Sequence, residues 1–287
     1  MVALALLQHP AAKRWLDGIV PAWTLLDGES FDALYRPPRS AEGALRLADD
    51  VTPDESPVAR NALLVLQKAS SGPGLKLTQT GNLSRSVVAE MIDLLCWPSF
   101  DKERMLAICK VVNEPDYLPL FFLHDLLRSA GLVRRHRGFL KASKAGRAVL
   151  EEPARRGLQG LLFHVAFWQL DLRIPGGLSL SGWPQNHMGV LLWSLSVAAG
   201  DWQSATRLAR LCTPPTVDVL ESPWDRGSIE LEYGIIRPLI WFGVMEEDWL
   251  NPAKRRPGDA KCYRKTALFD RFLSFDVKLE RTGERRH

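Results

Sequence analysis

The fold is decided by residues 117–150, YLPLFFLHDLLRSAGLVRRHRGFLKASKAGRAVL. Leucines recur at helical spacing through 117–129, and Gly131 marks the end of that helix. Residues 132–135 and 138–142 are then expected to form two strands around a basic turn. Ser143 follows as the N-cap of a short helix. Helix, hairpin and helix in this order predict a winged helix-turn-helix unit.

The same order of features recurs elsewhere in the chain. Residues 235–242 predict a helix, and Gly243 separates it from a strand at 244–247. After a long polar turn, a second strand is expected at 262–265, and Thr266 precedes a further short helix. A partial third copy at 74–95 again has a strand that leads into a helix. These matches indicate an internal repeat.

The repeated units predict a mainly α protein with small β-hairpins, built from tandem winged-helix-like units around a buried helical centre. That centre is expected at 161–170 and 188–199, where apolar residues occur on nearly every side of the predicted helices. We expect three segments. They are an N-terminal helical segment (1–60), a winged-helix-like domain (61–157), and a helical linker plus a second winged-helix-like unit (158–287).

Composition places the chain among ordinary globular proteins, with 46% hydrophobic and 24% charged residues in 287. No apolar run reaches the roughly 18 residues needed to cross a bilayer. Residues 1–7 lack the features of a signal peptide and predict a first amphipathic helix. The cysteines form no CxxC pair, so we expect neither disulfides nor a zinc site. They are Cys96, Cys109, Cys212 and Cys262. Together these features favour a cytoplasmic location. We also expect no cofactor.

Three stretches resemble the helical, winged-helix-like region of uncharacterised bacterial proteins related to the plasmid open-reading-frame-three-like family. They are LKLTQTGNL (75–83), LLRSAGLVR (126–134) and LKASKAGRAVL (140–150). The resemblance implies winged-helix elements and supplies no catalytic residues. The separate plasmid domain of that family is not seen in this sequence, so no role tied to that domain is carried over.

Positive charge gathers on the two predicted hairpins. Residues 134–147 contain six Lys or Arg and no acid, and residues 254–265 contain six and one acid, Asp259. Since the whole chain carries only +4, the remainder is net acidic. Such hairpin cations can neutralise phosphates beside a groove. We therefore predict a non-enzymatic nucleic-acid-binding or regulatory protein that contacts the backbone of double-stranded DNA. The predicted contacts are Arg134, Arg135, Arg137, Lys141, Lys144, Lys254, Arg255, Arg256 and Arg264.

The helix expected to read bases, at 118–129, is poorly equipped for that task. A base-reading helix usually exposes several Arg, Lys, Asn or Gln side chains, and this one offers three polar groups. These are His124, Asp125 and Arg128. Asn82 with the segment 84–86 is a better candidate. The weakness favours an alternative, a protein–protein interaction module with the winged-helix units as scaffold. Its contacts would be exposed tryptophans such as Trp183, Trp224 or Trp249.

No catalytic motif is found, whether a nucleophile elbow, a Walker-type loop, a Rossmann glycine pattern or His-Glu-x-x-His, so we expect no enzyme. One further alternative is a metal-dependent nuclease, because Asp259 with Asp276 and Lys278 has acid…Asp-x-Lys spacing. The Asp-Val-Lys follows a predicted helix instead of lying on a central strand, so chance is the simpler account. Neither a target sequence nor an oligomeric state follows from the sequence.

Overall fold

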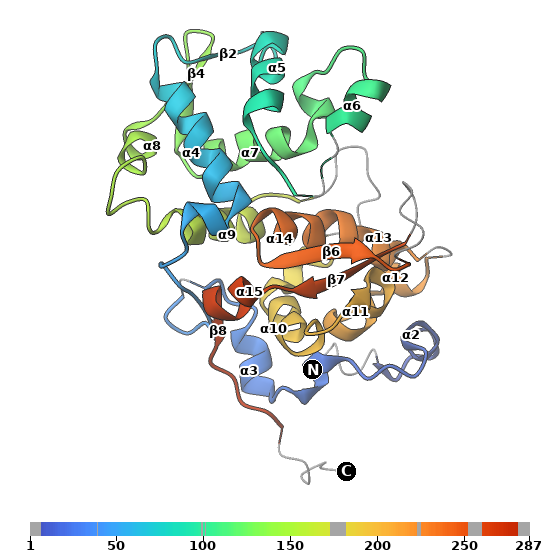
Figure 1. Ribbon diagram of the computed structural model, residues 1–287. Coiled ribbons are helices and arrows are strands. Elements are labelled where there is room, and N and C mark those ends of the chain that lie inside the picture. Colours follow the sequence, from blue (N-terminus) through green and yellow to red (C-terminus); the bar gives the residue numbers. More distant parts are fainter. Residues whose placement is uncertain are drawn as a thin grey trace. The chain divides into compact units, whose positions relative to one another are not determined.

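The computed structural model describes residues 7–38, 40–98, 100, 102–172, 182–222, 225–251 and 260–280 (Figure 1). In these residues helices predominate and the sheets are small and antiparallel, so the prediction of a mainly α protein with small β-hairpins is confirmed. The chain divides into two compact units. Unit 1 comprises 1–48, 171–240 and 244–287, and unit 2 comprises 49–170 and 241–243.

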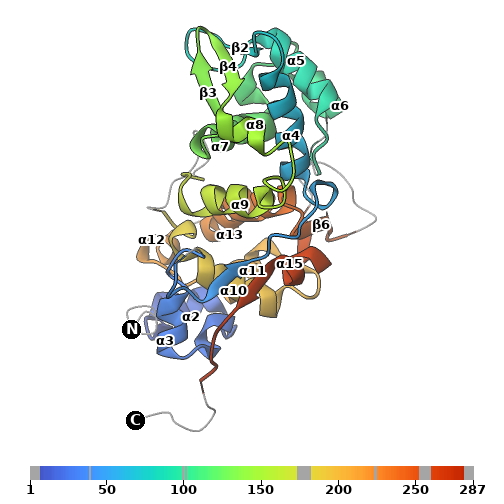
Figure 2. The same cartoon turned by 90° about the vertical axis from the view of Figure 1, so that its left-hand side faces the viewer.

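Unit 2 is a set of helices with one three-stranded sheet. Its α-helices are α4 (Pro57–Ser70), α5 (Arg85–Leu94), α6 (Lys102–Ile108), α7 (Leu118–Ser129), α8 (Lys144–Ala148) and α9 (Leu158–Trp168). Its strands are β2 (Leu75–Lys76), β3 (Val133–His136) and β4 (Phe139–Ala142), in the order β2-β4-β3. In Figure 2 the hairpin of β3 and β4 extends beyond α7 and α8.

The core of unit 2 follows from the leucine spacing of α7, whose inward leucines are fully buried. Ser143 caps α8, because its hydroxyl accepts the Gly146 N–H at 2.9 Å. Gly146 itself is required by close packing, since a Cβ there would lie 1.9 Å from the Leu132 carbonyl oxygen. Helix α9 packs Phe163 and Phe167 edge-on or tilted against Phe242. The sheet itself packs on helices, because α4 and α8 contact β4 and α7 contacts β3.

Unit 1 also combines helices with small sheets. Its helices are α2 (Pro10–Leu16), α3 (Gly28–Ala33), α10 (Met188–Ala198), α11 (Ala205–Cys212), α12 (Val217–Leu220), α13 (Arg226–Leu231), a π-helix (Glu232–Ile236), α14 (Arg237–Trp241, which ends in the 241–243 segment) and α15 (Ala267–Phe272). Strands β5 (Gln203–Ser204), β6 (Met245–Trp249) and β7 (Lys261–Lys265) form a sheet in the order β5-β7-β6. Strands β1 (Leu45–Leu47) and β8 (Leu273–Phe275) form a two-stranded sheet.

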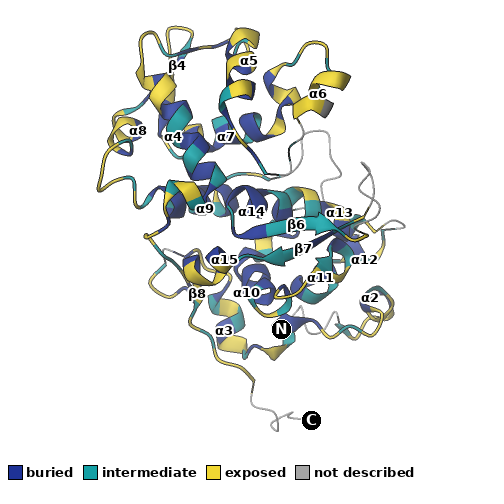
Figure 3. Ribbon diagram, viewed as in Figure 1, coloured by how far each residue is buried: buried dark blue, intermediate teal, exposed yellow. Residues whose placement is uncertain are grey.

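Short 3₁₀ helices complete the described elements. In unit 1 they are η1 (Ala22–Leu25) and η4 (Gln185–His187), and in unit 2 they are η2 (Pro53–Glu55) and η3 (Glu114–Asp116). The N-terminal segment of unit 1 is tied to the end of the chain, because β1 pairs with β8. Its buried Trp23 and Leu34 pack with Trp193 of α10. Figure 3 shows α10 as buried along almost its whole length.

The two three-stranded sheets share strand order and register. In unit 2, Leu75 faces Leu140 and Val133 faces Ala142; in unit 1, Gln203 faces Tyr263 and Met245 faces Lys265. Two backbone hydrogen bonds also recur. The N–H groups of Ser143 and Thr266 donate to Leu132 and Val244, and those of Leu132 and Val244 donate to Leu127 and Leu239. Each position of one sheet therefore has a defined equivalent in the other.

In the described part of the chain, no helix is both long and apolar enough to cross a membrane. Residues 1–6 of the predicted first helix lie outside the described residues.

Candidate nucleic-acid interface

Alternation along the unit 2 strands separates an inner from an outer sheet face. The inner face carries Leu75, Val133, Leu140 and Ala142, all buried in the core. The opposite side chains form the outer face, which we call the basic sheet face. It consists of Lys76, Arg134, His136, Phe139 and Lys141. Because the inner face fixes the register, a cation from each strand is placed on the outer face.

Two cations stand directly opposite each other on the basic sheet face, because Arg134 of β3 is in register with Lys141 of β4. Like charges at directly opposed positions destabilise a sheet. Within the described ranges, no carboxylate forms an ion pair with Arg134, Lys141 or the neighbouring Lys76. The face therefore carries charge that folding alone disfavours.

The turn and the following helix repeat this pattern of locally disfavoured cations. Arg137 occupies the left-handed region (φ 49°) beside Gly138 (φ 79°), at a turn position where Asn, Asp or Gly is usual. Lys144 is the first residue of α8, the end of a helix that repels cations. Both side chains are exposed. Arg147, in contrast, donates to the Ala142 carbonyl at 2.7 Å and helps to hold the hairpin.

The equivalent face of unit 1 is neutralised by its own acids. Arg264, equivalent to Lys141, pairs with Glu246 across the strands (Nε–Oε1 2.6 Å), and its guanidinium lies 4.4 Å from the Trp202 ring centroid. By alternation along β7, Lys261 and Lys265 lie on the opposite face of this sheet, where Lys261 pairs with Glu247. Lys265 donates to Asp270 at 2.7 Å. Of the cations predicted for this hairpin, only Arg264 can be placed, since Lys254, Arg255 and Arg256 lie outside the described residues.

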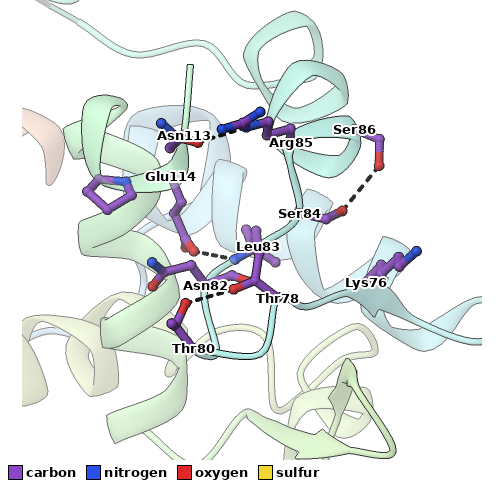
Figure 4. A pocket seen from close by; sticks show the side chains of 11 residues that line it. Lys76, Thr78, Thr80, Asn82, Leu83, Ser84, Arg85, Ser86, Asn113 and Glu114 are labelled. Carbon is purple, nitrogen blue, oxygen red and sulfur yellow. Dashed lines mark hydrogen bonds between the residues drawn. The ribbon is translucent and has the colours of Figure 1, made fainter. Parts of the chain in front are cut away.

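A hollow of about 710 Å³ adjoins the basic sheet face and shares Lys76 with it (Figure 4). The turn at 78–82 forms one wall, and Arg85 at the start of α5 lines it, donating to the Asn113 Oδ1 at 3.0 Å. Glu114 lies next to the turn, and its carboxylate accepts the Leu83 N–H. The hollow is thus bordered by cations and hydroxyl groups.

A second hollow, of about 440 Å³, is also lined by residues of this turn. Arg128 of α7 and Arg135 of β3 line it, together with Thr80 and Asn82, which also line the first hollow. Arg128 forms an ion pair with Asp125, three residues earlier on α7. The 78–82 turn is therefore a polar ridge between two hollows, each with two arginine or lysine side chains.

Glu114 is the buried centre of this region, with no exposed surface. One carboxylate oxygen accepts from Leu83, and the other lies 2.6 Å from the His124 Nδ1. A buried carboxylate is costly unless such partners satisfy it. Glu114 therefore connects the 78–82 turn to α7, and His124, predicted as a polar group of the reading helix, is occupied by this contact.

Of the tryptophans nominated for a protein partner, two lie in the described part of the chain, and neither is fully exposed. Trp183 was expected to be exposed and is instead buried, because its indole N–H donates to the Pro214 carbonyl at 2.9 Å and its ring packs on Val219. Trp249 is half-buried with Lys261 over its ring. Trp224 lies outside the described residues.

The spacing of the acid…Asp-x-Lys residues in space is not described, because Asp259 also lies outside the described residues. Asp276 and Lys278 lie in the segment after β8. The Asp276 N–H donates to the Ala44 carbonyl, and the Lys278 N–H donates to the Ser30 hydroxyl. Among the residues that can be described, no three His, Cys, Asp or Glu side chains gather as metal ligands.

Sequence reasoning missed two residues of the site. Lys76 joins the basic sheet face only because β2 pairs with β4, although it lies in the partial repeat at 74–95. Including the strand of that partial repeat in the search for positive charge could have identified Lys76. Glu114 carries no comparable signal, because it lies in a polar connection whose burial depends on tertiary packing.

Comparison with known proteins places the site inside the segment with detectable relatives. Residues 54–155 match the family model described as the Y4jL N-terminal domain. The chain is also 30% identical over 98 residues to the uncharacterized protein y4jL of Sinorhizobium fredii, which covers 34% of this chain and 44% of that protein. The chain thus spans less than half the length of this relative. No solved structure matches.

These matches support similarity to an uncharacterised bacterial family and give no support to the plasmid open-reading-frame-three-like family. The matched segment contains the basic sheet face, both hollows and the 78–82 turn, and leaves out the sheet of unit 1.

Proposed function

We propose that unit 2 is a winged-helix-like module that binds the phosphate backbone of double-stranded nucleic acid through the basic sheet face. The single observation that carries the proposal is the unpaired Arg134–Lys141 opposition, flanked by Lys76. A sheet gains nothing from two opposed cations in the absence of an anion. A phosphate between or beside them would reverse the sign of that interaction. The module has no catalytic role in this proposal, and a regulatory role would follow from binding alone.

The winged-helix interpretation is supported by element order. Helix α4, strand β2, helices α5 and α7, and the β3–β4 hairpin follow one another, with β4 central in the sheet. Unit 1 repeats that order with α10, β5, α11, the α13–α14 helix and the β6–β7 hairpin. In this interpretation the chain carries two such units, and in the described residues the opposed strand positions are two cations in unit 2 and an ion pair in unit 1.

The test is a salt titration of binding to random-sequence duplex DNA, measured by fluorescence anisotropy with the full chain. Wild type should bind at low salt, and its affinity should fall linearly with salt on log–log axes. The variant Arg134→Ala/Lys141→Ala should lower the slope by about 1.8, because each lost phosphate contact removes roughly 0.9.

Arg264→Ala is the matched control, because Arg264 occupies the position of Lys141 in the neutralised sheet. It should leave the slope unchanged. Absence of wild-type binding, or equal losses in the two variants, would refute the proposal.

A second candidate function, a protein-interaction module, is favoured by a separate observation. Leu106, Ile108 and Val111, on and after α6, are 45%, 71% and 54% exposed. Apolar side chains gathered in one exposed segment are typical of protein contact surfaces. A partner retained in high salt and released by Ile108→Asp, but not by Arg134→Ala/Lys141→Ala, would support this candidate over nucleic-acid binding.

A further inference from the structure

Beyond backbone contact, we infer that the 78–82 turn, Thr-Gln-Thr-Gly-Asn, reads base edges of the duplex in place of helix α7. The inference rests on the proposed function, because the basic sheet face would position the duplex against this turn. Phosphate contacts fix register and orientation, whereas hydrogen bonds to base edges carry sequence information. The turn is the polar ridge between the two hollows, and both hollows carry cations.

Helix α7 has little left with which to read bases. His124 contacts Glu114, and Arg128 is paired with Asp125 on the same helix. The remaining outward positions of the helix are largely apolar. A helix whose polar groups are already engaged loses those interactions when it binds bases, so the reading groups are better sought beside it.

The side-chain amides of Gln79 and Asn82 are the available groups. Neither amide has a hydrogen-bond partner among the residues described, and Gln79 is exposed while Asn82 lines both hollows. Asn and Gln amides can donate to N7 and accept from the N6 amino group of adenine in the major groove. Arg135 reaches the same turn, where it donates to the Gln79 carbonyl at 3.4 Å.

The turn is fixed well enough to hold these amides in place. The Thr78 N–H donates to the Asn82 carbonyl at 2.8 Å, and the Gly81 N–H donates to the Thr78 carbonyl at 3.1 Å. Gly81 has φ +96°, a conformation that side chains rarely adopt. The Glu114 carboxylate accepts the Leu83 N–H next to the turn (Figure 4). A reading element held by backbone bonds loses little entropy on binding.

The expected ligand is therefore a duplex that presents adenine at one or two fixed positions in the major groove. The experiment is selection of binding sites from a random duplex library with the full chain, followed by affinity measurement on the selected and random duplexes. Wild type should enrich adenine positions and prefer the selected duplex by about 10-fold or more, the range expected for bidentate amide contacts. Replacing those adenines with 7-deazaadenine should remove the preference.

Two variants test the residues. Gln79→Ala/Asn82→Ala should reduce the preference to below about 2-fold while random-duplex affinity and its salt slope stay unchanged. Gln79→Glu/Asn82→Asp removes the amide donors and should abolish the preference. Because it keeps side-chain size, it should leave the thermal melting of the chain unchanged. Arg128→Ala is the control on α7 and should keep the preference.

The outcomes separate the two proposals. If wild type binds random duplex but enriches no sequence, the turn does not read bases and backbone binding still holds. A preference that survives the turn variants and disappears in Arg128→Ala would assign reading to α7 and overturn the inference. If no duplex is bound at all, the proposed function itself fails.

Discussion

The sheets of unit 1 and unit 2 share order, register and two capping hydrogen bonds, yet they carry opposite charge arrangements. Where unit 2 opposes Arg134 and Lys141, unit 1 opposes Glu246 and Arg264 in an ion pair. The same strand pairing thus occurs with either arrangement. Since the neutral pair is the better one for folding, the cationic pair of unit 2 calls for a reason outside the fold.

The largest expected effect comes from giving unit 2 the charges of unit 1. Lys76→Ser/Arg134→Glu places the residues of the unit 1 sheet at their equivalent positions. Two phosphate contacts are lost and an acid is introduced beside the backbone. Affinity for random duplex DNA at low salt should fall by about 100-fold or more, with a slope lower by about 1.8, measured by anisotropy.

The reciprocal change gives its control. Glu246→Arg makes the unit 1 pair resemble that of unit 2, and duplex affinity should stay the same or rise. A fall comparable with that of the unit 2 variant would show that the two sheets do not differ in function.

The next largest effect is a loss of stability at acidic pH that arises from His187 in unit 1. Burial lowers the pKa of His187 to about 4, and its ring packs on Tyr35 at 5.4 Å between centroids. The unfolded chain, with an ordinary pKa near 6.5, binds the extra proton first as pH falls. Stability is therefore full above about pH 6.5 and declines towards pH 4, by up to about 3 kcal/mol.

Thermal or urea unfolding of the full chain between pH 7 and pH 4 measures this decline. His187→Gln should flatten the pH dependence, whereas His136→Gln, at an exposed position of unit 2, should reproduce the wild-type curve. A wild-type curve in the His187 variant would mean that other groups cause the loss.

A third prediction concerns a close contact specific to unit 2. Gly146 of α8 lies against the Leu132 carbonyl, whereas the equivalent position of unit 1 is the fully buried Phe269. Gly146→Ala forces the added carbon into backbone, so it should destabilise the chain by about 2 kcal/mol in urea unfolding. Gly157→Ala, with open space around its Cβ, is the control and should change stability by less than about 0.5 kcal/mol.

Local patterns predicted much of this fold. The leucine spacing before Gly131 and the Ser143 cap placed α7, the hairpin and α8 close to their observed bounds, because each depends on neighbouring residues alone. The pairing of β1 with β8 joins residues more than two hundred positions apart, and no local signal specifies it.

The site shows the same division. The sequence located positive charge on both hairpins, but the pairing of Arg264 with Glu246 depends on strand register, which hydrophobic patterning fixes only once the sheet forms. Counting charges along the chain therefore could not distinguish the opposed cations of unit 2 from Arg264 of unit 1, which is paired with Glu246. The burial of Trp183 was missed for a similar reason, since its cavity is formed by Val219 and Trp15 from distant segments.

The smallest effect tests whether the cationic pair costs stability. Arg134→Glu turns the opposed cations of unit 2 into a cross-strand ion pair with Lys141, and should stabilise the chain by about 0.5 kcal/mol. Glu246→Arg should destabilise it by a similar amount, because it opposes a cation to Arg264. Urea unfolding at low salt measures both, and added salt should shrink both differences through screening.

A neutral replacement, Arg134→Gln, separates the loss of repulsion from the gain of an ion pair and should give an intermediate value. If Arg134→Glu destabilises the chain, Arg134 has a structural role in β3, and the opposed cations no longer indicate an anionic partner. If it stabilises the chain while abolishing duplex binding, unit 2 retains at its surface an arrangement that folding disfavours and binding requires.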